Sequence, residues 1–106
     1  MSFTGSENHG ISLEAAAELT ARFRETISEG DIIGGFFGKD AVRDILQQTG
    51  CVGMRYYYGL DENEKPVLVL VGVDSDGNDM YDGELAELAF PCPDNCPSAN
   101  PLNSNS

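Results

Sequence analysis

Residues 51–73, CVGMRYYYGLDENEKPVLVLVGV, decide the fold of this 106-residue chain. β-branched and aromatic residues dominate both ends of the stretch, and such residues favour strands. We therefore predict one strand over about 51–58 and a second over about 67–73. The acidic run DENEKP between them is typical of a turn, so the two strands are expected to pair in antiparallel fashion.

The two predicted strands differ in how their apolar residues are distributed. Alternation along residues 51–58 places two sets of side chains on opposite faces. In residues 67–73 both faces are apolar, which predicts a central strand that is covered on each side. Pro66 fits the first position of that strand, where no ladder donor is required. The set expected to face the helices is Val52, Met54, Tyr56 and Tyr58, and the opposite set is Cys51, Gly53, Arg55 and Tyr57.

A helix is predicted before this stretch, over roughly 12–29. Apolar residues recur at spacings of three and four from Leu13 to Ile27, which places them on one helical face. The Ser12 hydroxyl can cap the first turn, and Gly30 is a natural residue to follow the last one.

A second, shorter helix is predicted over about 40–48, ended by Gly50. The segment between the helices, DIIGGFFGKD (residues 31–40), contains three glycines and no regular period, so we expect a connector. Its glycines allow another backbone to come close, which makes Phe36 and Phe37 candidates for an interaction surface.

Beyond the second strand, DSDGND (residues 74–79) is a strong turn signal. Residues 79–90 carry both a helical and an alternating pattern, and we favour a third strand because Gly83 interrupts the run. The end of the chain, residues 91–106, is rich in Pro, Asn and Ser and is expected to be an irregular tail.

The order of these elements predicts an α+β fold. Two N-terminal helices are expected to pack on a small antiparallel sheet of two or three strands. Residues 1–10 are expected to form a flexible arm and residues 11–90 a single α+β domain. Residues 91–106 are the irregular tail, which contains four of the five prolines and two of the three cysteines.

The charge of the chain excludes some classes of partner. With 18 acidic and 6 basic side chains, the net charge is −12 at pH 7. Nucleic-acid binding through a basic face is therefore disfavoured. Basic partners are favoured, and mimicry of a phosphate backbone is a further alternative. No apolar run reaches the roughly 20 residues of a membrane span. The start of the sequence lacks a secretory signal pattern, so a cytoplasmic location is expected, with non-classical export left open.

The Asp-rich turn is a candidate calcium site, because calcium prefers about six to eight oxygen ligands. Asp74, Asp76 and Asn78 match the first three ligand positions of an EF-hand loop. Asp79 stands where that loop needs glycine, and Leu85 stands where it needs glutamate. The match is incomplete, and the alternative is a solvated hairpin turn. The candidate calcium ligands are Asp74, Asp76, Asn78 and Asp79.

The three cysteines, Cys51, Cys92 and Cys96, form a second candidate site, for zinc or for redox chemistry. A structural zinc usually needs about four Cys or His ligands. His9 is the only histidine, so a complete site requires the arm and the tail to converge near the first strand. Cys92 and Cys96 can instead form a disulfide in an oxidising compartment, or pack as small apolar side chains.

Three parts of the sequence together resemble a known group of proteins. FFGKDAVRDILQQTGCVGMRYYYGL, VLVLVGVDSDGND and AFPCPDNC resemble small bacterial proteins of the Bacteroidetes type that have a GC-x-G-x-R-x-YY strand and a Cys-Pro-rich tail. The resemblance covers about residues 11–97 and implies that 36–59, 67–79 and 90–97 belong to one module. It implies no assigned activity and no catalytic residue.

We therefore expect a small soluble interaction or structural module that associates with itself or with another protein. An enzyme is less favoured, because no GxSxG, HExxH or Rossmann pattern is present and His9 falls in the expected arm. The alternative is a metal-binding protein with calcium or zinc. The tyrosine run can form a half-buried strand or a stacking platform for bases or sugars. The expected interaction surface is Phe36, Phe37, Tyr56, Tyr57 and Tyr58.

Native mass spectrometry before and after chelation distinguishes the module from the metal-binding protein. The module hypothesis predicts a multiple of the subunit mass, with no metal mass and no effect of the chelator. A monomer whose added metal mass disappears on chelation contradicts it. For a calcium site, replacing Asp76→Asn together with Asp79→Asn should weaken the calcium-induced thermal shift, because two carboxylate ligands are lost, and should leave self-association nearly unchanged.

Overall fold

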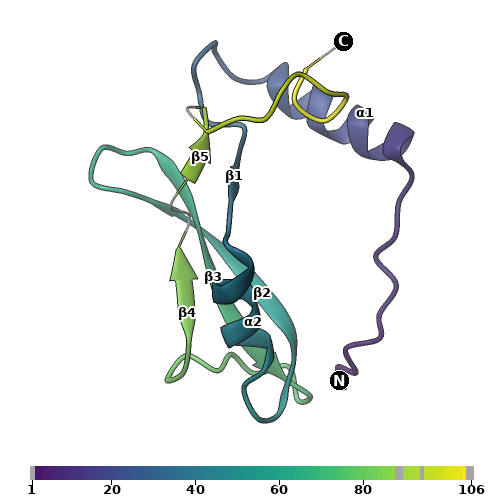
Figure 1. The fold of residues 1–106 in the computed structure, drawn as a ribbon, viewed down its shortest axis with the longest axis vertical. Helices are drawn as coiled ribbons and strands as arrows, with labels where there is room; N and C mark the ends of the chain where they lie inside the picture. The colour runs from purple at the N-terminus through teal and green to yellow at the C-terminus, as the bar shows by residue number, and fades with distance from the viewer. Residues whose placement is uncertain (1, 88–89, 94, 105–106) are drawn as a thin grey trace. The chain divides into compact units, whose positions relative to one another are not determined.

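The computed structural model describes residues 2–87, 90–93 and 95–104 (Figure 1). It confirms the α+β class, with two helices and two antiparallel sheets among the described residues. In chain order the elements are α1 (Leu13–Arg24), β1 (Gly34–Phe36), α2 (Lys39–Leu46), β2 (Cys51–Leu60), β3 (Pro66–Asp74), β4 (Leu85–Glu87) and β5 (Phe90–Cys92).

Internal contacts divide the chain into two compact units. We call residues 1–7 and 37–89 the hairpin unit, and residues 8–36 and 90–106 the disulfide unit. The predicted N-terminal arm is divided between the two units, and the predicted tail belongs to the disulfide unit.

The hairpin unit contains a three-stranded antiparallel sheet in the order β2-β3-β4. β3 is therefore the central strand, as its two apolar faces predict, and Leu70, Val71 and Val73 are buried. Pro66 occupies its first position, also as predicted. β2 begins at the expected residue and continues beyond its predicted end, to Leu60.

Helix α2 packs on one face of this sheet, and its bounds are close to those predicted. Ile45, its buried residue, is 1% exposed. A Cβ added to Gly72 would lie 3.5 Å from Ile45 Cγ2, so this face of β3 lies against the helix. Met54 is opposite Gly72 in the register and shares its face. The face of β2 that was predicted to pack against the helices therefore packs against α2 near Met54. A register shift between Cys51 and Gly53 interrupts the alternation at the start of β2.

The turn after β3 forms as its sequence predicts. Asp74 Oδ1 accepts the backbone N–H groups of Asp76 and Asn78, each at 3.0 Å. Gly77 adopts φ +84°, a conformation that glycine reaches without steric strain. The aspartate that opens this turn is therefore used to hold the turn closed.

A third strand is present, but it is shorter than the strand predicted over 79–90. β4 contains only Leu85–Glu87 and pairs with β3. Gln48 fixes the segment before it, because its Oε1 accepts the Glu84 N–H at 3.0 Å. Residues 88–89 of the predicted strand lie outside the described residues.

In the disulfide unit, α1 begins as predicted and ends earlier. The Ser12 hydroxyl accepts the Ala15 N–H at 3.0 Å, which is the expected N-cap. The helix is predicted to reach residue 29 but ends at Arg24. Thr26 accounts for the difference, because both its N–H and its hydroxyl donate to Phe23 O. These bonds tighten the last turn and satisfy a helix carbonyl early.

Gly30 is therefore not the residue that follows the helix. It adopts φ +92° in a separate turn, in which Asp31 N–H donates to Ser28 O at 3.1 Å. The Asp31 carboxylate in turn accepts the Ser28 N–H at 2.9 Å. Gly30 does lie in a turn, as its sequence position suggests, but this turn is in the connector after α1 and not at the end of the helix.

Strands β1 and β5 form the two-stranded sheet of the disulfide unit, which corrects two predictions (Figure 1). β1 lies in the segment predicted as an irregular connector, and β5 lies at the start of the predicted irregular tail. Gly34 is opposite Cys92 and Phe36 is opposite Phe90, and Ile33 N–H donates to Cys92 O at 2.7 Å. Because the pairing joins distant segments, neither local composition predicts it. The single predicted sheet is thus two sheets.

Replacing Ile45→Ala should lower the free energy of unfolding of the hairpin unit by about 2–5 kcal/mol, because the side chain is buried and leaves a cavity. Leu46→Ala is the matched control, since Leu46 is 45% exposed, and it should have a much smaller effect. Urea denaturation followed by circular dichroism measures both. Equal effects of the two substitutions would show that α2 does not pack through Ile45.

Candidate functional site

Strand β2 is an edge strand, because β3 is its only neighbour in the part of the sheet that the structure describes. At the end of the hairpin, Asp61 N–H donates to Lys65 O at 3.0 Å. Hydrogen bonds in an antiparallel pair alternate along each strand. The odd-numbered residues from Arg55 to Gly59 therefore also direct their backbone groups toward β3. The residues that direct theirs away, to the free edge, are Met54, Tyr56, Tyr58 and Leu60.

The side chains of these four residues lie on one face of β2, which we call the tyrosine face. Their exposed fractions are 39% for Met54, 55% for Tyr56, 82% for Tyr58 and 68% for Leu60. The rings of Tyr56 and Tyr58 meet edge to face, with centroids 5.5 Å apart and an interplanar angle of 86°. A hydrogen bond with Tyr56 raises the pKa of the Tyr58 hydroxyl. The free edge of β2 is therefore accompanied by a row of exposed apolar and aromatic groups.

Tyr57 belongs to the opposite face and is held by an ion pair. Its hydroxyl donates to Asp79 Oδ2, and Arg55 Nη1 donates to Asp79 Oδ1. Arg55 Nη1 also donates to Gly77 O at 3.2 Å, and its guanidinium carbon lies 5.9 Å from the centroid of the Phe3 ring. Tyr57 therefore lies on the face opposite to Tyr56 and Tyr58, as the alternation predicts, and the three tyrosines of the predicted interaction surface lie on two faces of β2.

Hydrogen bonds and charge shift the pKa values in this cluster. The hydrogen bond from Tyr57, followed by the hydrogen bond and positive charge of Arg55, lowers the pKa of Asp79 below its ordinary value of 3.8. The bond to Asp79 raises the pKa of Tyr57 and also that of Arg55. Both partners of the ion pair are therefore charged at neutral pH. Because Arg55 is the only charged residue in the sequence of β2, the strand has no unmatched charge.

The structure places the four candidate calcium ligands in one turn, but two of them already have partners. Asp74 Oδ1 accepts two backbone N–H groups, and both oxygens of Asp79 are engaged by Arg55 and Tyr57. Among the described residues, no group of three or more His, Cys, Asp or Glu side chains is arranged to hold a metal. The calcium site stays a prediction, and it would require Asp79 to leave its ion pair.

The three cysteines are divided between the two units. Cys51 is half-buried at the start of β2, where its Sγ donates to Gly53 O at 3.2 Å. Cys92 and Cys96 are joined by a disulfide in the other unit. The zinc or redox site stays a prediction, and zinc binding by that pair would require reduction of the disulfide.

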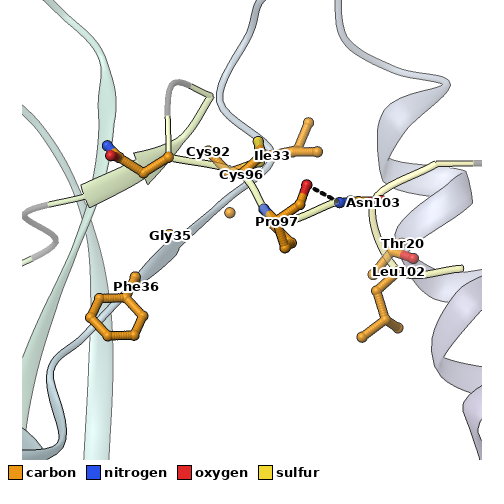
Figure 2. Close-up of a pocket in the computed structure, with 11 residues that line it drawn as sticks. Thr20, Ile33, Gly35, Phe36, Cys92, Cys96, Pro97, Leu102 and Asn103 are labelled. Carbon is orange, nitrogen blue, oxygen red and sulfur yellow. Dashed lines mark hydrogen bonds between the residues drawn. A yellow bond between two sulfur atoms is a disulfide. The ribbon is translucent and has the colours of Figure 1, made fainter. Parts of the chain in front are cut away.

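The disulfide unit has an open hollow of about 780 Å³ beside its disulfide (Figure 2). Phe36, one of the predicted interaction residues, lies at one end of it, and Leu102 lies at the other. Phe37 belongs to the hairpin unit and is half-buried. None of the described residues that line the hollow is charged. Its Asn103 amide donates to Pro97 O at 3.4 Å, so that donor is already engaged within the wall.

Comparisons with known proteins identified no relative of this chain. No protein-family model matches the sequence, and no curated protein or solved structure matches it significantly. The resemblance to small bacterial proteins stays a prediction. In the part of the chain that the structure describes, no helix is long and apolar enough to cross a membrane.

The structure adds two residues, Leu60 and Phe3, to those predicted from the sequence. Leu60 continues the tyrosine face, and a longer count of the alternation in MRYYYGL would have found it. Phe3 lies beside Arg55 and its N–H donates to Ser75 O at 2.8 Å. No local pattern connects residues so far apart in the chain, so this contact could not be predicted.

Removal of the Tyr57 hydroxyl should raise the pKa of Asp79 toward 3.8, because the bond from this hydroxyl is the largest cause of its low value. Carboxyl ¹³C NMR of a Tyr57→Phe variant should show a higher titration midpoint, whereas Tyr58→Phe should leave it unchanged. Because the pKa of Asp79 is lower in the folded chain, its stabilising contribution is complete above about pH 4 and decreases as the pH falls through the folded-state pKa. An unchanged midpoint in Tyr57→Phe contradicts the assigned cause.

Proposed function

We propose that this protein is a small non-enzymatic interaction module that binds an extended polypeptide along the free edge of β2. The observation that carries the proposal is the combination of unpaired backbone groups and the exposed tyrosine face on the same four residues. An added strand obtains its affinity from main-chain hydrogen bonds and its specificity from contacts of alternate side chains. Strand β2 offers both along one line.

The composition of β2 supports this use of its edge. Proteins usually protect an edge strand by keeping it short or by placing lysine, proline or an unmatched charge on it. β2 is 10 residues long, contains no lysine or proline, and has its one arginine paired with Asp79. The opposite edge strand of the same sheet, β4, has three residues in the part of the chain that the structure describes. The sheet therefore protects one edge and leaves the other able to pair.

Two kinds of occupant satisfy this proposal. A second copy of the chain can pair its own β2 with this edge, and a segment of another protein can do the same. The proposal does not include catalysis, because Asp61 and Asp74 hold turns, Asp79 is engaged by Arg55 and Tyr57, and the sequence contains no recognised nucleophile motif. A location in the cytoplasm and a bacterial source stay predictions.

Amide hydrogen exchange tests the proposal. In the free chain at low concentration, the amides of Met54, Tyr56, Tyr58 and Leu60 should exchange fast, because they face away from β3. They should become protected when the chain self-associates at high concentration, or when a neutral strand-forming peptide of alternating Thr and Val is added. ¹⁵N-resolved exchange measures each amide separately.

The control for this experiment is Tyr58→Pro. Proline removes an outward N–H without removing a bond to β3, and it leaves the preceding residue in an extended conformation. The variant should keep the melting transition of the hairpin unit and lose the protection, whereas Tyr58→Ala should keep part of the protection. Protection confined to other residues, or none under any condition, contradicts the proposed function.

A further inference from the structure

We infer that the occupant of the β2 edge is an extended basic segment of another protein rather than a second copy of this chain. The inference rests on the proposed function and names the partner of the same edge. It follows from the position of the charges at the two ends of β2.

The C-terminal end of β2 leads directly into an acidic turn. Asp61, Glu62 and Glu64 are exposed there, and Lys65 is the only base among residues 61–65. Asp61 Oδ1 accepts the N–H groups of Asn63 and Lys65 at 2.8 and 2.9 Å, so the turn is held in place. The end of the edge therefore presents a fixed negative charge.

The N-terminal end of β2 lies beside a second acidic turn. Asp74, the last residue of β3, is opposite Cys51 in the register, and Asp76 follows in the exposed part of the turn, beyond the end of the paired strands. Between the two ends, Arg55 is matched by Asp79. The free edge thus has a neutral, aromatic middle, and an acidic turn lies beyond each end of the β2–β3 pair.

A second copy of the chain is disfavoured by this arrangement. Antiparallel pairing of two β2 edges would bring the 61–64 turn of each copy to the Asp74 end of the other. Parallel pairing would bring the two 61–64 turns together. Like charges that meet in this way oppose association, and each copy also has a net charge of −12.

A basic segment converts both repulsions into attractions. At the start of β2, a Cβ added to Gly5 would lie 2.7 Å from Val52 O, so the N-terminal segment already lies against the strand there. The free edge runs from Met54 to Leu60, which at about 3.3 Å for each residue is about 23 Å. The expected partner therefore has Lys or Arg at both ends of an extended stretch of similar length. Between them, alternate apolar residues contact the tyrosine face, and a further Lys or Arg can lie over the rings of Tyr56 or Tyr58.

Three peptides of one length and one apolar core test the inference: one with Lys at both ends, one with Gln and one with Glu. Fluorescence anisotropy should show the Lys peptide binding about tenfold or more tightly than the Gln peptide, with the Glu peptide weakest. Raising the ionic strength from about 0.01 M to about 0.15 M shortens the Debye length from about 30 Å to about 8 Å. The preference for Lys should therefore decrease with salt.

Matched charge variants locate the attraction. Glu62→Gln with Glu64→Gln removes two charges at the β2 end and should abolish most of the preference for Lys. Asp82→Asn with Glu84→Gln removes two charges on the segment that leads to β4, the other edge of the same sheet, and should leave the preference intact. Tyr58→Pro should weaken binding of the Lys and Gln peptides alike.

The outcomes separate this inference from the proposed function. If the Lys and Gln peptides bind equally and both protect the β2 amides, the inference of a basic partner is wrong but the strand-binding function stands. The same conclusion follows if only self-association protects the β2 amides. If no peptide binds and no β2 amide is protected, both fail. If the Lys peptide binds more tightly but the Glu62 and Glu64 variant has no effect, its binding site is not the β2 edge and the inference is overturned.

Discussion

The pairing of β2 with β3 sets almost every feature of the hairpin unit. Its register places Met54 against Gly72 and therefore under α2, and it places Tyr57 on the opposite face, where Asp79 accepts its hydroxyl. A slip of one residue would exchange the two faces. The tyrosine face, the ion pair and the direction of the free backbone groups all follow from this one register.

The distribution of charge distinguishes the free edge of β2 from the rest of this acidic chain. The net charge of the chain is −12, but β2 contains one arginine and no acidic residue. The arginine is bound to Asp79, so the strand contributes no unmatched charge. Acids gather instead in the turns at its ends. The free edge of β2 is thus uncharged and is flanked by two acidic turns. A partner with complementary charges can match this pattern.

The sequence predicted the parts of the fold that depend on neighbours in the chain. The alternation in β2, the continuous apolar run of β3, the Ser12 cap and the Asp-rich turn are all local signals, and each is present in the structure. The sheet of β1 and β5 was missed because it is made by two segments with no strand pattern of their own. The contacts of Phe3 and Asp79 with β2 were missed for the same reason, since both join residues that are distant in sequence.

The same sheet of β1 and β5 has a consequence for the order in which the chain folds. Residues 37–89 lie between the two strands in sequence, so their pairing must close a long loop. Closing a long flexible loop has an entropic cost, whereas β2 and β3 are joined by a short turn and can meet early. The hairpin unit can therefore fold before β1 pairs with β5. During synthesis, β1 must remain unpaired until β5 has emerged, and the Cys92–Cys96 bridge can form only after that.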